Sequence, residues 1–157
     1  MRILFILFFA YILSFASIGQ IVLKNGSVYI KRAGLKIEAK NGSAIEKSDI
    51  IVTGEAGNAQ IKFIDGTVIT IGIKSTFKVE DYFYNNKAPK AKFKFLRGTF
   101  KSITGKIGHI APKNFKLQTR TATIGIRGTV VLGKTTPKGD IIACSVSYTH
   151  LTLPTKA

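Results

Sequence analysis

One pattern in this chain could bind a nucleotide phosphate. Gly128–Thr135 (GTVVLGKT) fits the phosphate-loop pattern G-x-x-x-x-G-K-[ST]. Such a loop needs small residues that expose backbone N–H groups to the phosphate, and a helix directly after it. The centre of the pattern, Val130–Leu132, favours a strand instead, and Pro137 and Gly139 oppose a following helix. We therefore expect a strand here rather than a nucleotide site.

A nucleophile and a histidine could support hydrolysis. His109 is the only histidine before residue 150, and Ser102 could be written beside it as a nucleophile. No G-x-S-x-G elbow is present, however, and His109 stands in a Gly-rich turn that is typical of a surface loop. An envelope hydrolase that uses His109 is therefore the weakest of three functional hypotheses, and we expect that the protein is not an enzyme.

Three aspartates, Asp49, Asp65 and Asp81, could be imagined as a calcium or acid–base cluster. Their spacing fits no EF-hand loop. Asp65 stands before Gly66, so it is better explained as a turn former that bonds its own backbone. The single cysteine, Cys144, excludes multi-cysteine metal sites and internal disulfides, and two histidines in all argue against multi-histidine sites. We expect no catalytic, metal or cofactor site.

The basic residues carry the strongest functional signal. Lys and Arg number 24 against 8 Asp and Glu, for a formal net charge of +16. Such a surface attracts polyanions. Alternatively, the lysines reflect an AT-rich genome or protect an edge strand. The candidate interaction residues form a basic face within one short stretch: Lys90, Lys92, Lys94, Arg97, Lys101 and Lys106.

Aromatic residues alternate with these cations. A period of two places Phe93 and Phe95 on one face of a strand and Lys92 and Lys94 on the other. The phenylalanines, including Phe100, are therefore expected in the core. Single-stranded nucleic acid is bound by aromatic rings on the basic face itself, so the pattern argues against a nucleic-acid partner.

The rest of the chain reads as strands and tight turns. Polarity alternates in several short segments that are rich in β-branched residues. Ser75–Tyr84 is the nearest rival for a helix, but Phe77 and Val79 alternate there, which favours a strand. No segment after residue 24 has a long, capped helical period. Alternation is seen in Val28–Lys31, Leu35–Ala39, Gln60–Phe63, Lys92–Phe95 and Phe115–Arg120.

Turn signals separate the strands. Asn25-Gly26, Asn41-Gly42 and Asp65-Gly66 tolerate positive φ and predict hairpins. A two-residue loop at Asp65-Gly66 would place Phe63 opposite Val68. Asn85–Lys90 is expected to be a loop within the domain, since neither flank alone could bury a core. The predicted fold is a single small all-β domain of short antiparallel strands and hairpins, sandwich or roll-like.

Several spaced segments, in the right order, resemble the FecR-like periplasmic domain. The resemblance spans roughly residues 18–132, and the glycine that the family usually has before its Asp is Ser48 here. It is carried by Asp49–Gly54, Gly57, Ala59, Ile61, Phe63, Asp65-Gly66-Thr67, Phe95–Phe100 and Thr119–Thr129. The candidate structural motif comprises Asp49, Gly54, Asp65, Gly66, Thr67, Arg127, Gly128 and Thr129.

Arg127 stands between Gly125 and Gly128 at the end of this motif. Its five fixed donors could bridge backbone carbonyls and hold the loop, or could face an anionic ligand. We favour the structural role.

The resemblance implies an exported all-β domain with a sensing, signalling or scaffold role at the cell envelope. The founding member of the family regulates a sigma factor through a cytoplasmic N-terminal domain. Two residues precede the first apolar run here, so we do not expect the sigma-regulator function.

The N-terminus is typical of an export signal. Met1-Arg2 is followed by an apolar run from Ile3 to Phe15, and small residues favour cleavage after Ala16. The alternative is an uncleaved anchor, because no charge occurs from residue 3 to residue 23. Both interpretations export the domain, with Arg2 on the cytoplasmic side. We expect a signal peptide at 1–16 and a periplasmic or envelope location.

The last residues, 145–157, break the style of the chain. Ser145–Leu151 can be back-translated as the mosaic end of a transposon used to prepare sequencing libraries. We interpret this tail as an assembly artefact, with an ordinary polar tail as the alternative. The domain then spans residues 17–144, with its C-terminal end missing.

These observations lead to two main functional hypotheses. The first is a non-enzymatic FecR-like domain that mediates protein or envelope contacts. The second is a basic-surface binder of acidic envelope polysaccharide or another polyanion. The expected partner is accordingly an envelope protein or an acidic polysaccharide, and membrane contact is expected only through an uncleaved N-terminal segment.

Overall fold

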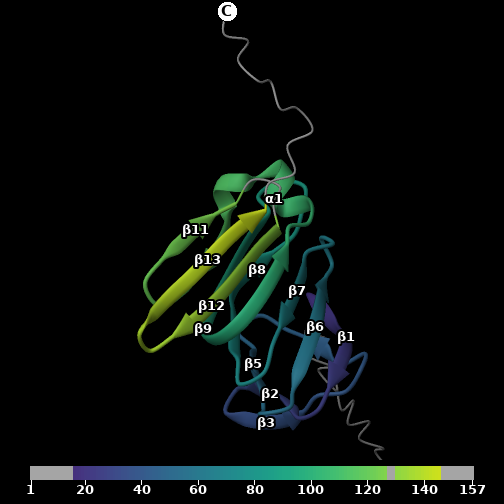
Figure 1. The fold of residues 1–157 in the computed structure, drawn as a ribbon. Helices are drawn as coiled ribbons and strands as arrows, with labels where there is room; N and C mark the ends of the chain where they lie inside the picture. The colour runs from purple at the N-terminus through teal and green to yellow at the C-terminus, as the bar shows by residue number, and fades with distance from the viewer. Residues whose placement is uncertain (1–15, 127–129, 146–157) are drawn as a thin grey trace, which may run out of the picture.

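The computed structural model describes residues 16–126 and 130–145, and these form a single all-β domain. The predicted signal peptide, except Ala16, and the tail beyond Ser145 lie outside the described residues. The strands join into one 13-stranded sheet that curls on itself like a half-barrel (Figure 1). The all-β prediction is confirmed. The two halves of the curl are not separate sheets, because one long strand belongs to both. We divide the sheet at that strand into two halves, called sheet A and sheet B.

Sheet B is the half that contains Lys92, Lys94 and Arg97 of the candidate basic residues. Its strand order is β3-β2-β5-β8-β9-β10-β11, and its pairings are antiparallel except for the parallel pair β9–β10. Its strands are β2 (Val28–Arg32), β3 (Leu35–Glu38), β5 (Ile50–Thr53), β8 (Thr76–Phe83), β9 (Lys90–Ile103), β10 (Phe115–Gln118) and β11 (Thr123–Gly125).

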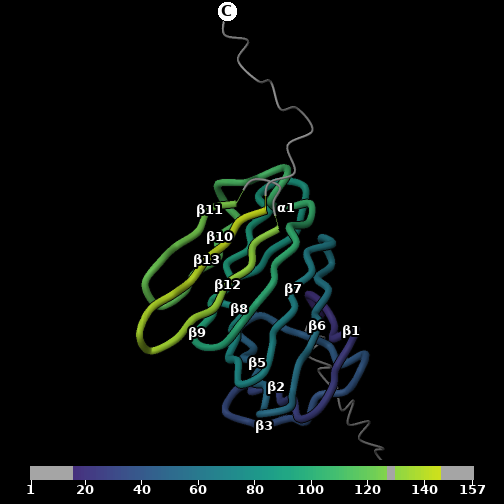
Figure 2. The backbone as a smooth tube through the Cα atoms, viewed as in Figure 1, coloured from purple at the N-terminus to yellow at the C-terminus, as the bar shows by residue number. Residues whose placement is uncertain are grey.

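Sheet A shares β9 and is antiparallel throughout. Its strand order is β4-β1-β6-β7-β9-β12-β13. The backbone tube shows β9 beside β8 and β12, above the end of the molecule that β2 and β3 form (Figure 2). Its other strands are β1 (Gly19–Asn25), β4 (Ala44–Ile45), β6 (Asn58–Phe63), β7 (Val68–Ile71), β12 (Val130–Thr136) and β13 (Gly139–Ser145).

The change of sheet occurs at Gly98. The first half of β9 pairs with β8 and β10, and the second half pairs with β7 and β12. Phe93 and Phe95 point into the core before the glycine, whereas Phe100 and Ser102 do so after it, so the inward parity shifts. Gly98 has φ +95°, and a Cβ there would lie 2.5 Å from the Cα of Ser75. Bends of this kind let one strand serve two sheets.

A continuous hydrophobic core fills the curl. Phe93 is fully buried and contacts the rings of Phe63 at 4.8 Å and Phe77 at 5.7 Å. Phe95 stacks on Phe100 with 3.6 Å between ring centroids. The prediction that Phe93, Phe95 and Phe100 face the core is therefore confirmed, and with it the outward direction of the lysines between them.

Local alternation predicted the strands well, but two of the three hairpins are wrong. Asn25-Gly26 connects β1 of sheet A to β2 of sheet B, and Asn41-Gly42 connects β3 to β4, again in different sheets. Gly26 and Gly42 do adopt positive φ, as expected of turn residues. The turns pass between sheets because β1 and β2 each find their partners elsewhere.

Asp65-Gly66 does close a hairpin, between β6 and β7, but with a different register. Val68 lies opposite Lys62, not opposite Phe63. The N–H of Gly66 donates to the carbonyl of Phe63, and the N–H of Phe63 donates to the carbonyl of Thr67. The loop is thus longer than two residues, and the glycine at φ +86° takes up the extra residue.

Helical structure among the described residues is limited to two short segments, α1 (Lys106–Ile110) and a 3₁₀ turn (Pro112–Asn114). The predicted strand over Ser75–Tyr84 and the predicted loop that follows it are confirmed. No helix in the described part of the chain has the length and apolarity needed to cross a membrane.

Candidate functional site

Outward-facing lysines from four strands line up across sheet B. Pairing places Lys36 opposite Lys31, Lys31 opposite Ile50, Ile50 opposite Lys78, and Lys78 opposite Lys94. On the far side of Lys94 the same register continues through Gln118 of β10 to Thr123 of β11. Cross-strand partners point to the same face of a sheet. We call Lys36, Lys31, Lys78 and Lys94 the lysine row.

Further cations lie on either side of the row. Lys92 pairs with both Lys116 and Asp81, and Arg97 pairs with Thr76. The basic face is defined here as the lysine row together with Lys92, Arg97 and Lys116. The acidic side chains on the same outer face are Glu38, Glu80 and Asp81.

The structure separates the six cations that the sequence placed together. Lys92, Lys94 and Arg97 lie on the basic face. Lys101 lies beyond Gly98, on the outer face of sheet A, where it pairs with Thr70 and Leu132. Lys106 begins α1, and Lys90 begins β9. Their separation follows from the shift of β9 between the sheets.

Sequence reasoning missed the cations that other strands contribute, Lys31, Lys36, Lys78 and Lys116. Alternation within β2 and β10 does predict that Lys31 and Lys116 point outward. Their membership of one face depends on strand order, however, and no local pattern encodes that order. The sequence pattern therefore predicted which way these side chains point, but not which of them share one face.

Ion pairs occupy only part of this charge. Lys78 pairs with Glu80 at 3.3 Å, and Asp81 pairs with Lys47 at 2.8 Å and with Lys90 at 2.6 Å. Hydrogen bonds from Lys47 and Lys90 lower the pKa of Asp81 below its usual value. Lys36 lies 3.9 Å from the ring centroid of Tyr29. Among the described residues, no carboxylate lies within salt-bridge distance of Lys31, Lys92, Lys94, Arg97 or Lys116.

A shallow concavity lies at the β10–β11 end of the row. It has a volume of about 390 Å³ and is lined by side chains that can donate to an anion or a hydroxyl. The guanidinium of exposed Arg120 donates to the carbonyl of Pro137 at 3.1 Å, which ties this loop to the β12–β13 turn. Its polar lining consists of Lys94, Gln118, Thr119, Arg120, Thr121 and Thr123.

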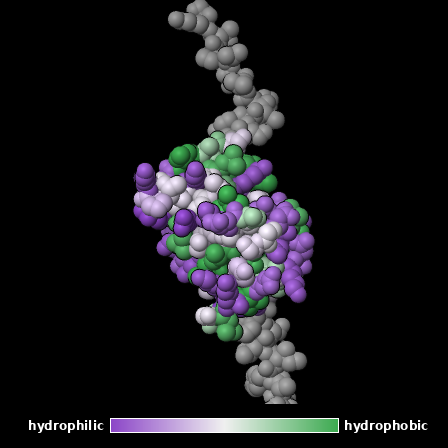
Figure 3. Space-filling view, turned by 60° about the horizontal axis from the view of Figure 1, so that its bottom comes forward, coloured by the Kyte–Doolittle hydropathy of each residue, from purple (hydrophilic) through white to green (hydrophobic). Residues whose placement is uncertain are grey.

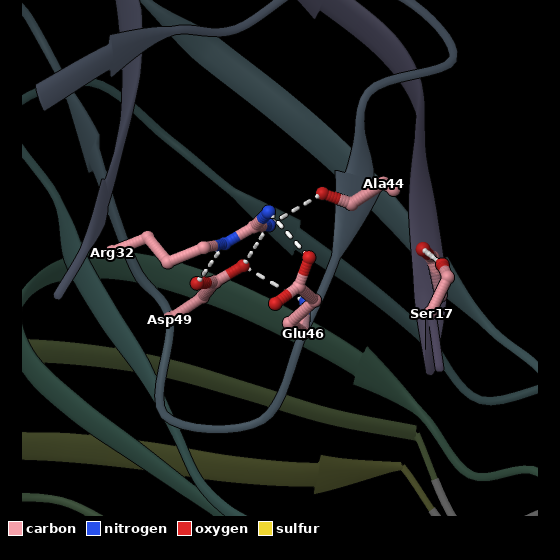
Figure 4. Close-up of polar contacts among 6 residues, drawn as sticks. Ser17, Arg32, Ala44, Glu46 and Asp49 are labelled. Atoms are coloured by element: carbon pink, nitrogen blue, oxygen red, sulfur yellow. Dashed lines mark hydrogen bonds and ion pairs between the residues drawn. The ribbon is translucent and has the colours of Figure 1, made fainter. Parts of the chain in front are cut away.

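A buried ion pair lies near the other end of the row (Figure 4). Asp49 is fully buried and accepts two hydrogen bonds from Arg32, from Nε at 2.8 Å and from Nη2 at 2.6 Å. Glu46 lies 2.5 Å from Nη1, and the carbonyl of Ala44 accepts from Nη2 at 3.0 Å. The hydrogen bond to Asp49 is the main cause of the raised pKa of Arg32. Because four of its bonds are internal, this arginine holds the β4–β5 loop.

A groove of about 680 Å³ runs beside this pair, with Leu35 and Ile37 in its wall. Both side chains are well exposed, at 68% and 40%. The space-filling view, turned to bring forward the end of the molecule where β3 lies, shows apolar patches between hydrophilic ones (Figure 3).

A second buried carboxylate, Asp65, has no cationic partner among the residues that the structure describes. Its oxygens accept from the Tyr82 hydroxyl at 2.8 Å, the Thr67 hydroxyl at 2.7 Å and the N–H groups of Thr67 and Ile107. Burial raises the pKa of Tyr82 far above its usual value, with the charge of Asp65 as the next cause. The prediction that Asp65 bonds its own turn is confirmed. The structure adds that the same carboxylate anchors the start of α1.

The remaining residues of the candidate structural motif lie near these anchors or in the tight turn after β5. Gly54 follows β5, where a Cβ would lie 2.0 Å from the Oγ of Ser27. The hydroxyl of Thr67 accepts from the N–H of Gly105, and Gly66 takes the positive φ of the hairpin. Arg127, Gly128 and Thr129 lie outside the described residues.

The residues considered for hydrolysis, nucleotide binding and metal binding do not come together in one site among the described residues. Ser102 is fully buried in β9, whereas His109 is exposed on α1. Gly133, Lys134 and Thr135 lie within β12, and β13 follows through a tight turn, so the strand expected in place of a phosphate loop is confirmed for the described part of this pattern. The described residues hold no group of three or more His, Cys, Asp or Glu side chains that could bind a metal.

Fold and site together define a small all-β domain with two buried carboxylate anchors and one lysine-rich sheet face. A family model described as "FecR protein" matches residues 49–147, which is more than half of the chain. The chain therefore belongs to the FecR family, and the resemblance seen in the sequence is confirmed. The match begins at Asp49 and includes the strands from β5 to β13.

A solved structure described as "Cell surface anchoring domain" is 34% identical over 39% of this chain and 82% of its own length, with a TM-score of 0.38. No curated protein matches the chain.

Proposed function

We propose that this FecR-family chain is a non-enzymatic binding module of the cell envelope that contacts its partner through the basic face. The observation that carries the proposal is the arrangement of Lys31, Lys94 and Lys116. They come from three different strands, they share one outer face, and no carboxylate in the described part of the chain lies within salt-bridge distance of them. A binding role fits a face of this kind better than a catalytic one.

The electrostatics support the same function. Uncompensated positive charge on one face raises the rate of encounter with acidic partners, and the effect weakens as salt is added. Stability alone gives no reason for the cluster, because like charges directly opposite each other across a strand pair are destabilising. Lys31 faces Lys36, and Lys78 faces Lys94, in this way.

The envelope location rests on the N-terminal segment, whose charge pattern is that of an export signal. Bacterial envelopes offer both acidic polymers and acidic protein surfaces as partners for such a face.

The test compares two charge-matched variants. The face-B variant carries Lys31→Gln, Lys94→Gln and Lys116→Gln. The face-A variant carries Lys62→Gln, Lys101→Gln and Lys134→Gln, three exposed lysines on the outer face of sheet A. The purified wild type and both variants are immobilised, incubated with envelope extract, and washed at about 0.15 M and then about 0.5 M salt, since screening grows over that range.

We expect wild type and the face-A variant to capture the same component and the face-B variant to lose it. Equal capture by all three proteins would contradict the proposal, as would capture by none. Survival of a stoichiometric protein in the wash at high salt would identify a specific protein contact.

A further inference from the structure

We propose that the ligand of the basic face is a linear acidic polysaccharide that lies along the lysine row and seats one acidic group between Lys94 and Arg120. This inference rests on the proposed function and names the chemistry of its partner. It draws on the direction of the row, on the concavity at its end, and on the positions of the acidic and aromatic side chains.

The row is one residue wide and crosses the sheet. Adjacent strands lie about 4.8 Å apart, so the seven aligned positions from Lys36 to Thr123 extend over about 29 Å. Sugar units in an extended chain repeat at a distance close to this strand spacing. Successive acidic groups of a polymer can therefore meet successive positions of the row. Between Lys36 and Lys94, only the position of Ile50 carries no positive charge.

Curvature favours a polymer over a flat surface. Adjacent strands are rotated by about 20° to 25°, and this sheet curls like a half-barrel. The lysines of the row consequently point in successively different directions. A planar lipid surface could reach only some of them at once, whereas a chain molecule can follow the curve.

Acidic side chains lie beside the row rather than in it. Glu38 lies next to Tyr29 in the register on one side, and Glu80 and Asp81 lie on the other side. Glu80 and Asp81 are already held in ion pairs with Lys78, Lys47 and Lys90. The aligned positions of the row therefore carry no carboxylate that a polyanion would have to displace, and the cations Lys92, Arg97 and Lys116 border it.

The concavity at the end of the row has the lining that a hydroxylated, acidic sugar needs. Lys94 and Arg120 provide positive charge, while Gln118, Thr121 and Thr123 provide amide and hydroxyl groups for the sugar hydroxyls. The bond from Arg120 to the Pro137 carbonyl fixes one end of the guanidinium and leaves other N–H groups for a carboxylate.

Aromatic side chains disfavour nucleic acid at this face. Phe93, Phe95 and Phe100 are buried, with at most 4% exposed. Tyr29, on the outer face, is already covered by the ammonium group of Lys36 at 3.9 Å. Phe83, at the end of β8, is 48% exposed on this outer face beside Lys90. It lies off the lysine row, and the aligned positions of the row from Lys36 to Thr123 carry no aromatic ring on which successive bases could stack.

The experiment measures binding of polygalacturonate, a linear uronic-acid polymer, to the purified protein by titration calorimetry from about 0.05 to 0.3 M salt. Neutral dextran, monomeric galacturonate and phosphatidylglycerol vesicles are the comparison probes. The proteins are wild type, the face-B and face-A variants, and Arg120→Gln.

We expect wild type to bind the polymer and to bind monomer and dextran far more weakly. The face-B variant should lose about tenfold or more in affinity, and the slope of log affinity against log salt should fall by about two, as expected for three lost cations. Arg120→Gln should weaken binding by about threefold or more, while the face-A variant stays within about threefold of wild type.

Equal losses in the face-B and face-A variants would overturn the proposal, because net charge alone would then explain binding. Tighter binding to the vesicles than to the polymer would overturn it in favour of a lipid surface. If polygalacturonate fails to bind while the face-B variant still loses its envelope partner, the polysaccharide inference fails and the binding module stands. If neither effect is seen, both proposals fail.

Discussion

The outer faces of the two sheets differ although β9 belongs to both. Sheet B presents seven basic side chains within a few registers. The outer face of sheet A presents Ile103, Leu132 and Ile141, exposed at 38%, 46% and 70%, with only scattered lysines among them. The same lysine-rich composition has thus produced one face with clustered charge and one face on which single lysines alternate with exposed apolar residues. The lysine content of the chain alone therefore does not explain why the lysines cluster on the outer face of sheet B.

The two sheets also bury their carboxylates differently. Asp49, in the loop before β5 of sheet B, is neutralised by Arg32 in a two-pronged pair. Asp65, in the β6–β7 loop of sheet A, accepts only from uncharged donors within residues 16–126 and 130–145. Both satisfy the rule that a buried charge needs full hydrogen bonding, with or without a counter-charge. If this difference matters for stability, removal of the two carboxylates should have unequal costs.

The largest effect is expected at the junction of the sheets. Gly98→Ala would force a side chain into the left-handed region at φ +95° and within 2.5 Å of the Ser75 Cα. We expect a loss of about 3 kcal/mol or more in the free energy of unfolding, because backbone strain and a backbone clash coincide. Chemical denaturation, followed by circular dichroism, measures it.

Gly34→Ala is the matched control, since Gly34 also has positive φ (+80°) but nothing lies within 4 Å of its Cβ position. Its cost should be about 1 kcal/mol, from backbone strain alone. Equal costs at the two glycines would show that the close packing at the junction is not what holds the sheets together.

The second effect distinguishes the two anchors. Asp65→Ala leaves the buried hydroxyls of Tyr82 and Thr67 and two N–H groups without their acceptor, and should cost about 3 kcal/mol. Asp49→Ala should cost less, about 2 kcal/mol, because Arg32 keeps Glu46 and is partly exposed to water. Denaturation midpoints of the two variants give the comparison, and a reversed order would refute this account of the anchors.

The sequence predictions that were confirmed depend only on residues that are neighbours in the chain. Alternation predicted that Phe93 and Lys94 face opposite ways, because side-chain direction in a strand is fixed by neighbouring residues alone. The family resemblance around Asp65 also held, because its turn chemistry is local. Neither required knowledge of which strands pair.

The sequence predictions that were wrong depend on which strands pair with each other. Asn25-Gly26 and Asn41-Gly42 have the chemistry of hairpin turns, yet they link different sheets, since partner choice depends on the whole sheet. No pattern in the sequence near Gly98 predicted that β9 changes sheets there, which places Lys101 on sheet A and not on the basic face. The lysine row itself arises only when the strand order is known.

A smaller, stabilising effect is expected at Ser48. This residue has φ +70°, a conformation that favours glycine, and glycine is what the family usually has there. Ser48→Gly should raise the free energy of unfolding by about 0.5 kcal/mol, because relief of strain exceeds the added entropy of the unfolded chain. Ala56→Gly, at an exposed turn residue without positive φ, should lower it by a similar amount. Thermal denaturation of both variants tests the opposite signs.

The smallest effect concerns pH and the contact between sheet edges. Hydrogen bonds from the hydroxyls of Thr119 and Thr121 lower the pKa of Asp140. A carboxyl whose pKa is lowered in the folded state stabilises the fold above its unfolded pKa of about 3.9, and that stability is lost as pH falls through the folded value. The melting temperature of wild type should therefore decline as the pH drops below about 4. Asp140→Asn should decline less over the same range, and an identical decline would show that Asp140 makes no such contribution.

The most direct test of the central claim is a lysine footprint. The protein is acetylated briefly with and without envelope extract, and the rate at each lysine is read by mass spectrometry. Partner binding through the basic face predicts that Lys31, Lys94 and Lys116 are protected while Lys62, Lys101 and Lys134 react at unchanged rates. Protection of the second set instead, or equal protection of both, would contradict the claim that sheet B carries the function.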